Sequence, residues 1–141
     1  MKRINELYKL FILFLIGGNI YCLIELLYRQ RTHWSMFLLG GLCFIAIDCL
    51  NEYIEWDLSL IIQDIIGTNI ITIGEFIFGC IFNLWLKLNV WDYSNIPFNL
   101  LGQICLPFCL VWAFIALIAI FVSDYLRFWL FGEEKPHYKL F

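Results

Sequence analysis

The sequence predicts an all-α membrane protein with four transmembrane helices, arranged as two helical hairpins in a single domain of residues 1–141. Of its residues, 62% are hydrophobic and only 15% are charged, which differs from the usual balance of a soluble protein. Several apolar runs follow one another, so the first run does not resemble a cleaved signal peptide. The bilayer is therefore the expected environment of the chain.

Two short matches indicate an internal duplication that would produce the two hairpins. In the first match, Ile16, Gly17, Asn19, Ile20 and Glu25 recur as Ile66, Gly67, Asn69, Ile70 and Glu75. In the second match, Leu38, Leu39, Gly40 and Cys43 recur as Leu100, Leu101, Gly102 and Cys105. The repeats then cover residues 10–54 and 58–122, and both have the same orientation because each crosses the membrane twice. Duplicated membrane proteins often form a binding site where their halves meet.

The first two helices are expected at residues 10–28 and 36–50. About twenty apolar residues cross the hydrocarbon core, and the first run has this length. The second run is uninterrupted only as far as Ile47. It is either a short tilted span that continues through Tyr53 or a helix sheltered by its neighbours.

The third and fourth helices are expected at residues 58–82 and 100–122, where the duplication supports them despite their polar residues. Residues 123–131 mix Asp124 and Arg127 with aromatic side chains, which predicts a short helix at the membrane interface. The alternative is that this segment is the end of the fourth helix. Residues after Gly132 are polar and are expected to be loose.

Four crossings place both termini on one side of the membrane. That side carries more basic residues, namely Lys2, Arg3, Lys9, Arg127, Lys135 and Lys139, against Arg29, Arg31 and Lys87 on the other. The positive-inside rule then favours cytoplasmic termini.

Composition and motifs exclude several classes of function. A net charge of −3 with scattered basic residues argues against a nucleic-acid partner. The sequence contains no G-x-x-x-x-G-K-[ST] phosphate loop, so any ATP hydrolysis requires another subunit. It also contains no nucleophile elbow, zinc motif or cofactor fingerprint, which argues against an enzyme and predicts no catalytic residue, no cofactor and no metal.

The six cysteines fall in or near apolar runs and are expected to be packed thiols, although Cys105 and Cys109 share a helix face that could bind a soft metal.

A polar stripe marks one face of the third helix. Its members follow helical spacing and are Asp64, Thr68, Thr72, Glu75 and Gly79. A charge at the bilayer centre costs roughly 2.5 to 3.5 kcal/mol on insertion scales, so this face should point into the protein, a cavity or a partner.

Glu25 and Glu75 are the acids that the duplication relates. Arg29 lies one turn beyond Glu25 and can pair with it, either as a structural ion pair at the membrane edge or within a functional site. Glu75 has no basic residue at neighbouring helical positions, so its partner must come from another segment. The first connection supplies the expected partners, which are Arg29, Arg31 and His33.

The second connection, residues 83–99, is rich in aromatic residues. Trp85, Trp91 and Tyr93 suit either an anchor at the membrane interface or a lid over the polar residues, and Asp92 is then expected to face inward. The expected polar site or pathway comprises Glu25, Arg29, His33, Glu75, Asn83, Asp92, Tyr93, Asn99 and Gln103.

Small and amide residues supply further expectations. The glycines of the helical runs are expected at close helix contacts, with an unwound ligand-binding segment as the alternative. Asn19 and Asn69 are equivalent in the repeats and are expected to hydrogen-bond across the axis that relates them.

The stretch GGNIYCLIELLYRQRTHWSMFLLGGLCF and the run NVWDYSNIPFNLLGQ, residues 89–103, closely resemble a bacterial membrane-protein family described as putative ABC-transporter type IV, or CmpB-like. The resemblance extends from residue 17 to about residue 125 and includes Glu25, Arg29, His33, Trp34, Met36 and Glu75. It implies a permease-like component of the bacterial cell membrane that works with separate ATPase subunits.

These observations favour a small permease or permease subunit with a polar site at the repeat interface. A unit of this size is expected to form a homo-oligomer in order to enclose a pathway. The alternatives are an intramembrane enzyme that acts on a lipid or amphiphile, with Glu75 and His33 as acid and base, and a membrane assembly or regulatory subunit without transport activity.

Overall fold

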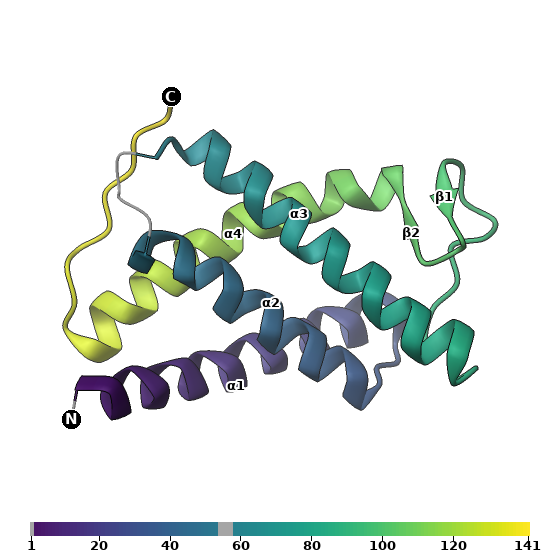
Figure 1. The fold of residues 1–141 in the computed structure, drawn as a ribbon, viewed down its shortest axis with the longest axis horizontal. Coiled ribbons are helices and arrows are strands. Elements are labelled where there is room, and N and C mark those ends of the chain that lie inside the picture. The colour runs from purple at the N-terminus through teal and green to yellow at the C-terminus, as the bar shows by residue number, and fades with distance from the viewer. Residues whose placement is uncertain (1, 54–57) are drawn as a thin grey trace.

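The computed structural model describes residues 2–53 and 58–141, which form a bundle of four α-helices (Figure 1). The helices are α1 (Lys2–Arg29), α2 (Trp34–Tyr53), α3 (Leu60–Gly79) and α4 (Leu106–Phe131). A π-helical turn, η1 (Cys80–Trp85), extends α3, and an antiparallel hairpin of β1 (Asn99–Leu100) and β2 (Ile104–Cys105) precedes α4. Successive helices run in opposite directions, so both termini lie at the same end of the bundle (Figure 1).

The described helices confirm the all-α class expected for a membrane protein. Three segments are long and apolar enough to cross a bilayer, namely Asn5–Arg29, Leu60–Trp85 and Leu106–Phe131. In α2 the apolar part, Trp34–Leu50, is shorter than the roughly twenty residues that span a hydrocarbon core. This helix contacts α1, α3 and α4, so its neighbours shelter it.

Small residues set the spacing between α1 and α2. A Cβ added at Gly17 would overlap the Phe44 side chain, and one added at Gly40 would overlap Tyr21. The two helices can approach this closely only because these positions lack side chains. Both glycines therefore lie at close contacts between the helices, as the sequence predicts.

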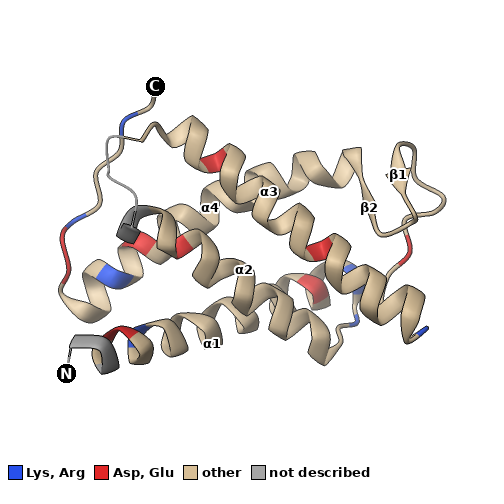
Figure 2. Ribbon diagram, in the orientation of Figure 1, with Lys and Arg blue, Asp and Glu red and all other residues tan. Residues whose placement is uncertain are grey.

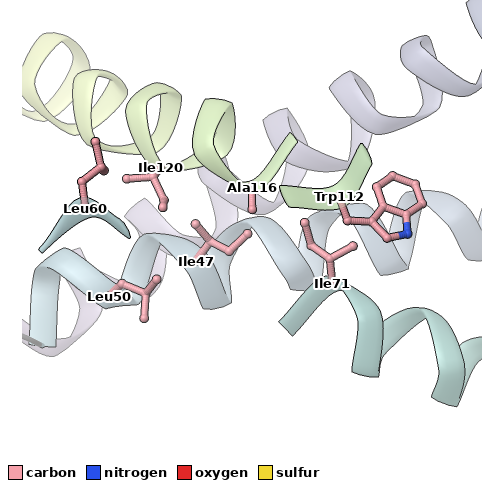
Figure 3. Close-up of a cluster of buried hydrophobic side chains, with 7 residues drawn as sticks. All are labelled: Ile47, Leu50, Leu60, Ile71, Trp112, Ala116 and Ile120. Atoms are coloured by element: carbon pink, nitrogen blue, oxygen red, sulfur yellow. The ribbon is translucent and has the colours of Figure 1, made fainter. Parts of the chain in front are cut away.

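The largest buried cluster joins α2, α3 and α4 (Figure 3). Its members are Ile47, Leu50, Leu60, Ile71, Trp112, Ala116 and Ile120. Lipid tails are as apolar as these side chains, so the cluster stabilises the bundle through close van der Waals packing rather than through removal from water. This packing fixes α3 against α4 and so determines where the polar residues of α3 lie.

The fourth helix begins later than the sequence predicts. We expected it from residue 100, but Leu100 lies in β1 and α4 begins at Leu106, with Pro107 in its first turn. The backbone at Phe98, Leu101 and Gly102 has positive φ angles of 57°, 54° and 71°, which an α-helix does not accommodate. The second sequence match therefore pairs a helix with a hairpin and was wrong as a structural repeat.

The first match joins positions with comparable contacts. Gly17 of α1 lies against Phe44 of α2, and Gly67 of α3 lies against Ala116 of α4. Duplication of the hairpins stays a prediction, and its expected boundary near residue 54 lies outside the described residues.

The end of the chain differs from the expected interfacial helix and loose tail. The α4 helix is continuous to Phe131, and its Ser123, Asp124 and Arg127 side chains are buried. Segment 123–131 is thus the end of the fourth helix, which was the alternative interpretation. The tail packs against the bundle, because the Tyr138 hydroxyl donates to Asp124 at 2.8 Å and the Leu60 amide donates to the Lys139 carbonyl at 2.7 Å.

The six cysteines, all within the described residues, form no disulfide, as expected for reduced thiols. Cys105 is buried, and the other thiols are half-buried. Within residues 2–53 and 58–141, no three or more His, Cys, Asp or Glu side chains are grouped as metal ligands would be.

Candidate functional site

Glu75, like Asp48, is an acid almost completely enclosed by the bundle. It lies on the buried face of α3, its side chain is 1% exposed, and its two oxygens accept from different segments. Oε1 accepts from the Tyr93 hydroxyl at 2.6 Å, and Oε2 accepts from Trp112 Nε1 of α4 at 2.5 Å. The carboxylate thus joins α3, α4 and the connection between them.

The donors to Glu75 are neutral aromatic groups rather than the basic residues that we expected. The Tyr93 ring stacks on Phe108 of α4 with centroids 4.7 Å apart. Burial, followed by the negative charge of Glu75, raises the pKa of the Tyr93 phenol well above its ordinary value, so the hydroxyl remains a donor. The expected direct bond between Glu75 and Arg29, Arg31 or His33 is not found in the described residues, although the charge of Arg29 acts on Glu75 from a distance.

The predicted pair of Glu25 and Arg29 is present. Arg29 Nε donates to Glu25 Oε2 at 2.6 Å, and the Glu25 side chain is largely buried. Arg29 Nη1 also donates to the Val90 carbonyl at 3.0 Å, while Arg31 Nη2 donates to the Asn89 and Val90 carbonyls at 2.8 Å each. Both arginines of the first connection therefore hold the backbone of the second connection.

Residues 86–105 form a segment that we call the cover loop, and two amide side chains fix its shape. Asn83, on the π-helical turn, donates to Gln103 Oε1 at 2.8 Å and accepts from the Val90 amide at 2.6 Å. Trp91 Nε1 donates to the Gln103 carbonyl at 2.9 Å. These bonds hold the loop against the end of α3 and so bring Tyr93 to Glu75.

Three of the expected site residues organise the connections instead of facing Glu75. Asp92 is exposed and accepts from the Ser94 amide at 2.8 Å, and hydrogen bonds from the Ser94 amide and hydroxyl hold the pKa of Asp92 below its ordinary value. The inward orientation expected for Asp92 was therefore wrong. Asn99 is exposed and bonds with the backbone of its own loop, while His33 Nδ1 lies 2.8 Å from the Ser35 hydroxyl at the start of α2.

The aromatic residues of the second connection divide between two orientations. Trp85 is 76% exposed, as an interfacial anchor would be, whereas Trp91 is 4% exposed and Tyr93 is half-buried. The Trp91 and Tyr93 side chains thus point into the bundle, and the choice between an anchor and a lid stays a prediction.

The buried face of α3 is rotated relative to the predicted stripe. Its members are Leu60, Gln63, Gly67, Ile71, Glu75 and Gly79, while Asp64, Thr68 and Thr72 are half-buried.

The amides of Asn19 and Asn69 donate to carbonyls of their own helices, Leu15 and Ile65, so the bond expected between the repeats was wrong.

Two adjoining cavities lie beside Glu75. The inner cavity has a volume of about 90 Å³ and mainly apolar walls from all four helices, with Glu75 at its edge. The outer cavity has a volume of about 370 Å³ and is lined by Glu25, Arg29 and Tyr93 among others. Tyr21 and Trp112 line both cavities, so the cavity beside Glu75 and the cavity beside the Glu25–Arg29 pair share a wall.

A family model described as "Putative ABC-transporter type IV" matches residues 9–138. The chain belongs to this family. The match includes all four helices and the cover loop, as the sequence resemblance led us to expect. Comparison with curated proteins and with solved structures gave no match.

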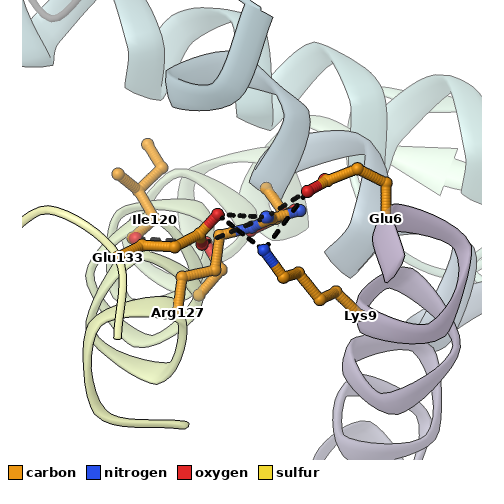
Figure 4. A network of polar contacts seen from close by, with 7 residues as sticks. Glu6, Lys9, Ile120, Arg127 and Glu133 are labelled. Atoms are coloured by element: carbon orange, nitrogen blue, oxygen red, sulfur yellow. Dashed lines mark hydrogen bonds and ion pairs between the residues drawn. The ribbon is translucent and has the colours of Figure 1, made fainter. Parts of the chain in front are cut away.

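A second polar network in this family member was missed by the sequence analysis. Charged residues gather toward both ends of the bundle (Figure 2), and Arg127 occupies the end that carries the termini (Figure 4). Its Nε and Nη2 donate to the two oxygens of Asp48 at 2.8 Å each, and its Nη1 donates to Glu133 at 3.1 Å. Lys9 pairs with Glu133 at 3.1 Å and with Glu6 at 3.2 Å. Ionisable residues within apolar helices usually pair with one another, and this rule applied to Asp48 and Arg127 could have identified the network.

Proposed function

We propose that the protein is a membrane permease, or the membrane-spanning subunit of one, with the Glu75 region as its polar intramembrane site. The observation that carries this proposal is the enclosure of a carboxylate on a long apolar helix at the edge of a cavity. Burial of such a group is expensive, and a helix that served only for packing would gain from an apolar residue at this position. Membership in an ABC-transporter family supports the same conclusion.

The cover loop controls access to this site in the proposed mechanism. Tyr93 blocks one side of Glu75 through its 2.6 Å hydrogen bond, and the Asn83 and Gln103 amides hold the loop in place. Release of the loop would break the Tyr93 bond and leave one oxygen of Glu75 available to a substrate. The contacts of Arg29 and Arg31 with the loop backbone couple this movement to the first connection.

Separate ATPase subunits would supply the energy, and further copies of the chain would complete a pathway. The family description supports an ATPase partner, and the small size of the four-helix unit supports a homo-oligomer. We further propose cytoplasmic termini in a bacterial cell membrane, following the distribution of basic residues.

Flux measurements in proteoliposomes test the proposal. The wild type is compared with Glu75→Gln, which keeps the side-chain volume and removes the charge, and with Glu134→Gln, which makes the same change in the exposed tail. We expect movement of at least one compound from a broad panel, a large loss for Glu75→Gln and no change for Glu134→Gln. Equal rates for all three proteins, or no movement of any compound, would contradict a permease site at Glu75.

The enzyme alternative receives little support from the site. His33 bonds with Ser35, whereas Glu75 bonds with Tyr93 and Trp112, so the proposed acid and base do not act on a common position. The assembly-subunit alternative would be favoured if a partner complex kept full activity with Glu75→Gln.

A further inference from the structure

The outer cavity has exposed residues of α1 and α4 in its wall, and these would face lipid where the two apolar helices span a bilayer. Its rim includes Ile24 and Tyr28 of α1, which are 40% and 70% exposed, and Val111 of α4, which is 44% exposed. Tyr28 contacts Phe108 across the opening in an edge-to-face arrangement, with ring centroids 6.3 Å apart. The exposed Tyr28 ring and Phe108 therefore stand on this side of the cavity.

A positively charged pocket adjoins the outer cavity at the end of the bundle. It has a volume of about 370 Å³ and is lined by Arg29, Arg31, Thr32 and His33 together with residues 88–90. Arg29 lines both spaces and connects them. In the described residues Glu25 pairs with Arg29, but no ion pair involves Arg31, so the pocket has an excess of positive charge.

Arg29 also retains an unused hydrogen-bond donor. Its Nη2 is buried and has no hydrogen-bond partner, although Nε and Nη1 are both bonded. A buried donor of a charged group without a partner is costly, and an anionic oxygen is the acceptor that suits a guanidinium best. The pocket thus provides net positive charge, and Arg29 in its wall has one buried donor without a partner.

We propose that this site binds an anionic single-chain amphiphile that enters from the bilayer between α1 and α4. This inference rests on the proposed function and names the class of its substrate. The carboxylate or phosphate headgroup bonds with Arg29 Nη2 and Arg31, and the alkyl chain lies along the outer cavity past Tyr21 and Trp112 into the inner one. The outer volume of about 370 Å³ lies in the lower part of the roughly 300 to 1,000 Å³ range of ligand pockets, and the inner volume of about 90 Å³ lies below it, which favours one chain over two.

The aromatic pairs between α1 and α4 give this ligand a defined route. Tyr28 and Phe108 stand at the outer opening, and Tyr21 and Trp112, with centroids 6.2 Å apart, stand between the two cavities. Trp112 donates to Glu75, so a chain that displaced the Trp112 ring would disturb the Glu75 carboxylate. Binding of the amphiphile is thereby linked to the proposed site.

Binding to the purified full-length protein in zwitterionic nanodiscs tests the inference. The probe is stearate with a nitroxide at its chain end, which quenches tryptophan fluorescence when the chain enters the cavities. We expect saturable quenching by this probe, and much weaker binding of the matched alcohol, which carries no charge. Arg29→Gln and Arg31→Gln should each weaken binding roughly tenfold, whereas Lys87→Gln, an exposed cation outside both cavities, should not change it.

One further variant tests the inference even if the arginine variants fold poorly. Val111→Trp adds a large side chain at the lipid-facing rim, alters no hydrogen bond of the cover loop, and should reduce quenching by filling the opening. Equal binding of the acid and the alcohol, or equal affinity in the Val111→Trp and wild-type proteins, would overturn the inference. Displacement of the probe by inorganic phosphate, or by a two-chain anionic lipid as effectively as by unlabelled stearate, would also overturn it.

The two proposals can fail separately. Saturable binding of the probe without flux of any compound would leave this inference intact and contradict the permease. Flux that depends on Glu75 without binding of the probe would support the permease and overturn the amphiphile.

Discussion

Removal of Arg127 should destabilise the bundle more than removal of any surface charge. Its side chain is 4% exposed, and it bonds with Asp48, whose side chain is 0% exposed, and with Glu133. The change Arg127→Met keeps an unbranched apolar stem but leaves Asp48 buried without its cation. Loss of one partner of a buried pair costs about 3 to 5 kcal/mol, which we expect as the fall in unfolding free energy.

The change Asp48→Leu should cost less than Arg127→Met. Arg127 would keep Glu133 at 3.1 Å and Glu6 at 3.5 Å, so its charge would remain paired and the expected loss is about 1 to 3 kcal/mol. The double variant removes both buried charges and should recover most of the loss caused by Arg127→Met, because apolar groups of similar size often replace a buried ion pair without cost.

Equilibrium unfolding in mixed detergent micelles, followed by far-ultraviolet circular dichroism, measures these differences. Lys135→Met, a change in the exposed tail, is the matched control. Equal stability of the Arg127→Met and Lys135→Met proteins would refute the reasoning. A double variant whose loss equals the sum of the single losses would show that the two residues do not depend on each other.

Three further predictions concern the site and the thiols. Gly79→Ala should destabilise the protein by about 1 to 3 kcal/mol and speed proteolysis of the cover loop, because the new Cβ would stand 2.8 Å from the Gln103 Cβ; an unchanged cleavage rate would contradict this. Tyr93→Phe should lower the unfolding free energy by about 1 to 3 kcal/mol, since Glu75 loses a donor, and Tyr125→Phe at a half-buried site is the control that should differ little from wild type. Mass spectrometry after alkylation in denaturant without reductant should find all six cysteines modified, and a missing adduct would reveal a disulfide.

Features that depend on neighbouring positions could be predicted from the sequence. Runs of apolar residues identified the first two helices, and helical spacing identified the pair of Glu25 and Arg29 because both residues lie on one helix. The importance of Glu75 followed from its charge within an apolar run. Each of these inferences needed only residues within a few turns of one another.

The partners of Glu75 could not be found in this way, because they depend on the path of the cover loop. The amides of Asn83 and Gln103 fix that path, and their pairing spans a hairpin whose apolar residues also fit a helix. The expected start of the fourth helix at residue 100 failed for the same reason, since the positive φ of Leu101 results from the tertiary fold and not from a glycine or proline at that position.

The polar regions around Arg127 and Arg29 each contain a guanidinium paired with a carboxylate, but they differ in how many of its nitrogens have hydrogen-bond partners. Arg127 uses Nε, Nη1 and Nη2 in bonds with Asp48 and Glu133, and such a saturated cation can hold helices together but has little left for a ligand. Arg29 leaves Nη2 buried without a partner and lines a cavity of about 370 Å³. Since a buried donor without a partner is destabilising, the bundle keeps Arg29 in this state at an energetic cost that a ligand could offset. This difference, rather than the presence of charge within the membrane, is why we assign binding to the Arg29 end and stability to the Arg127 end.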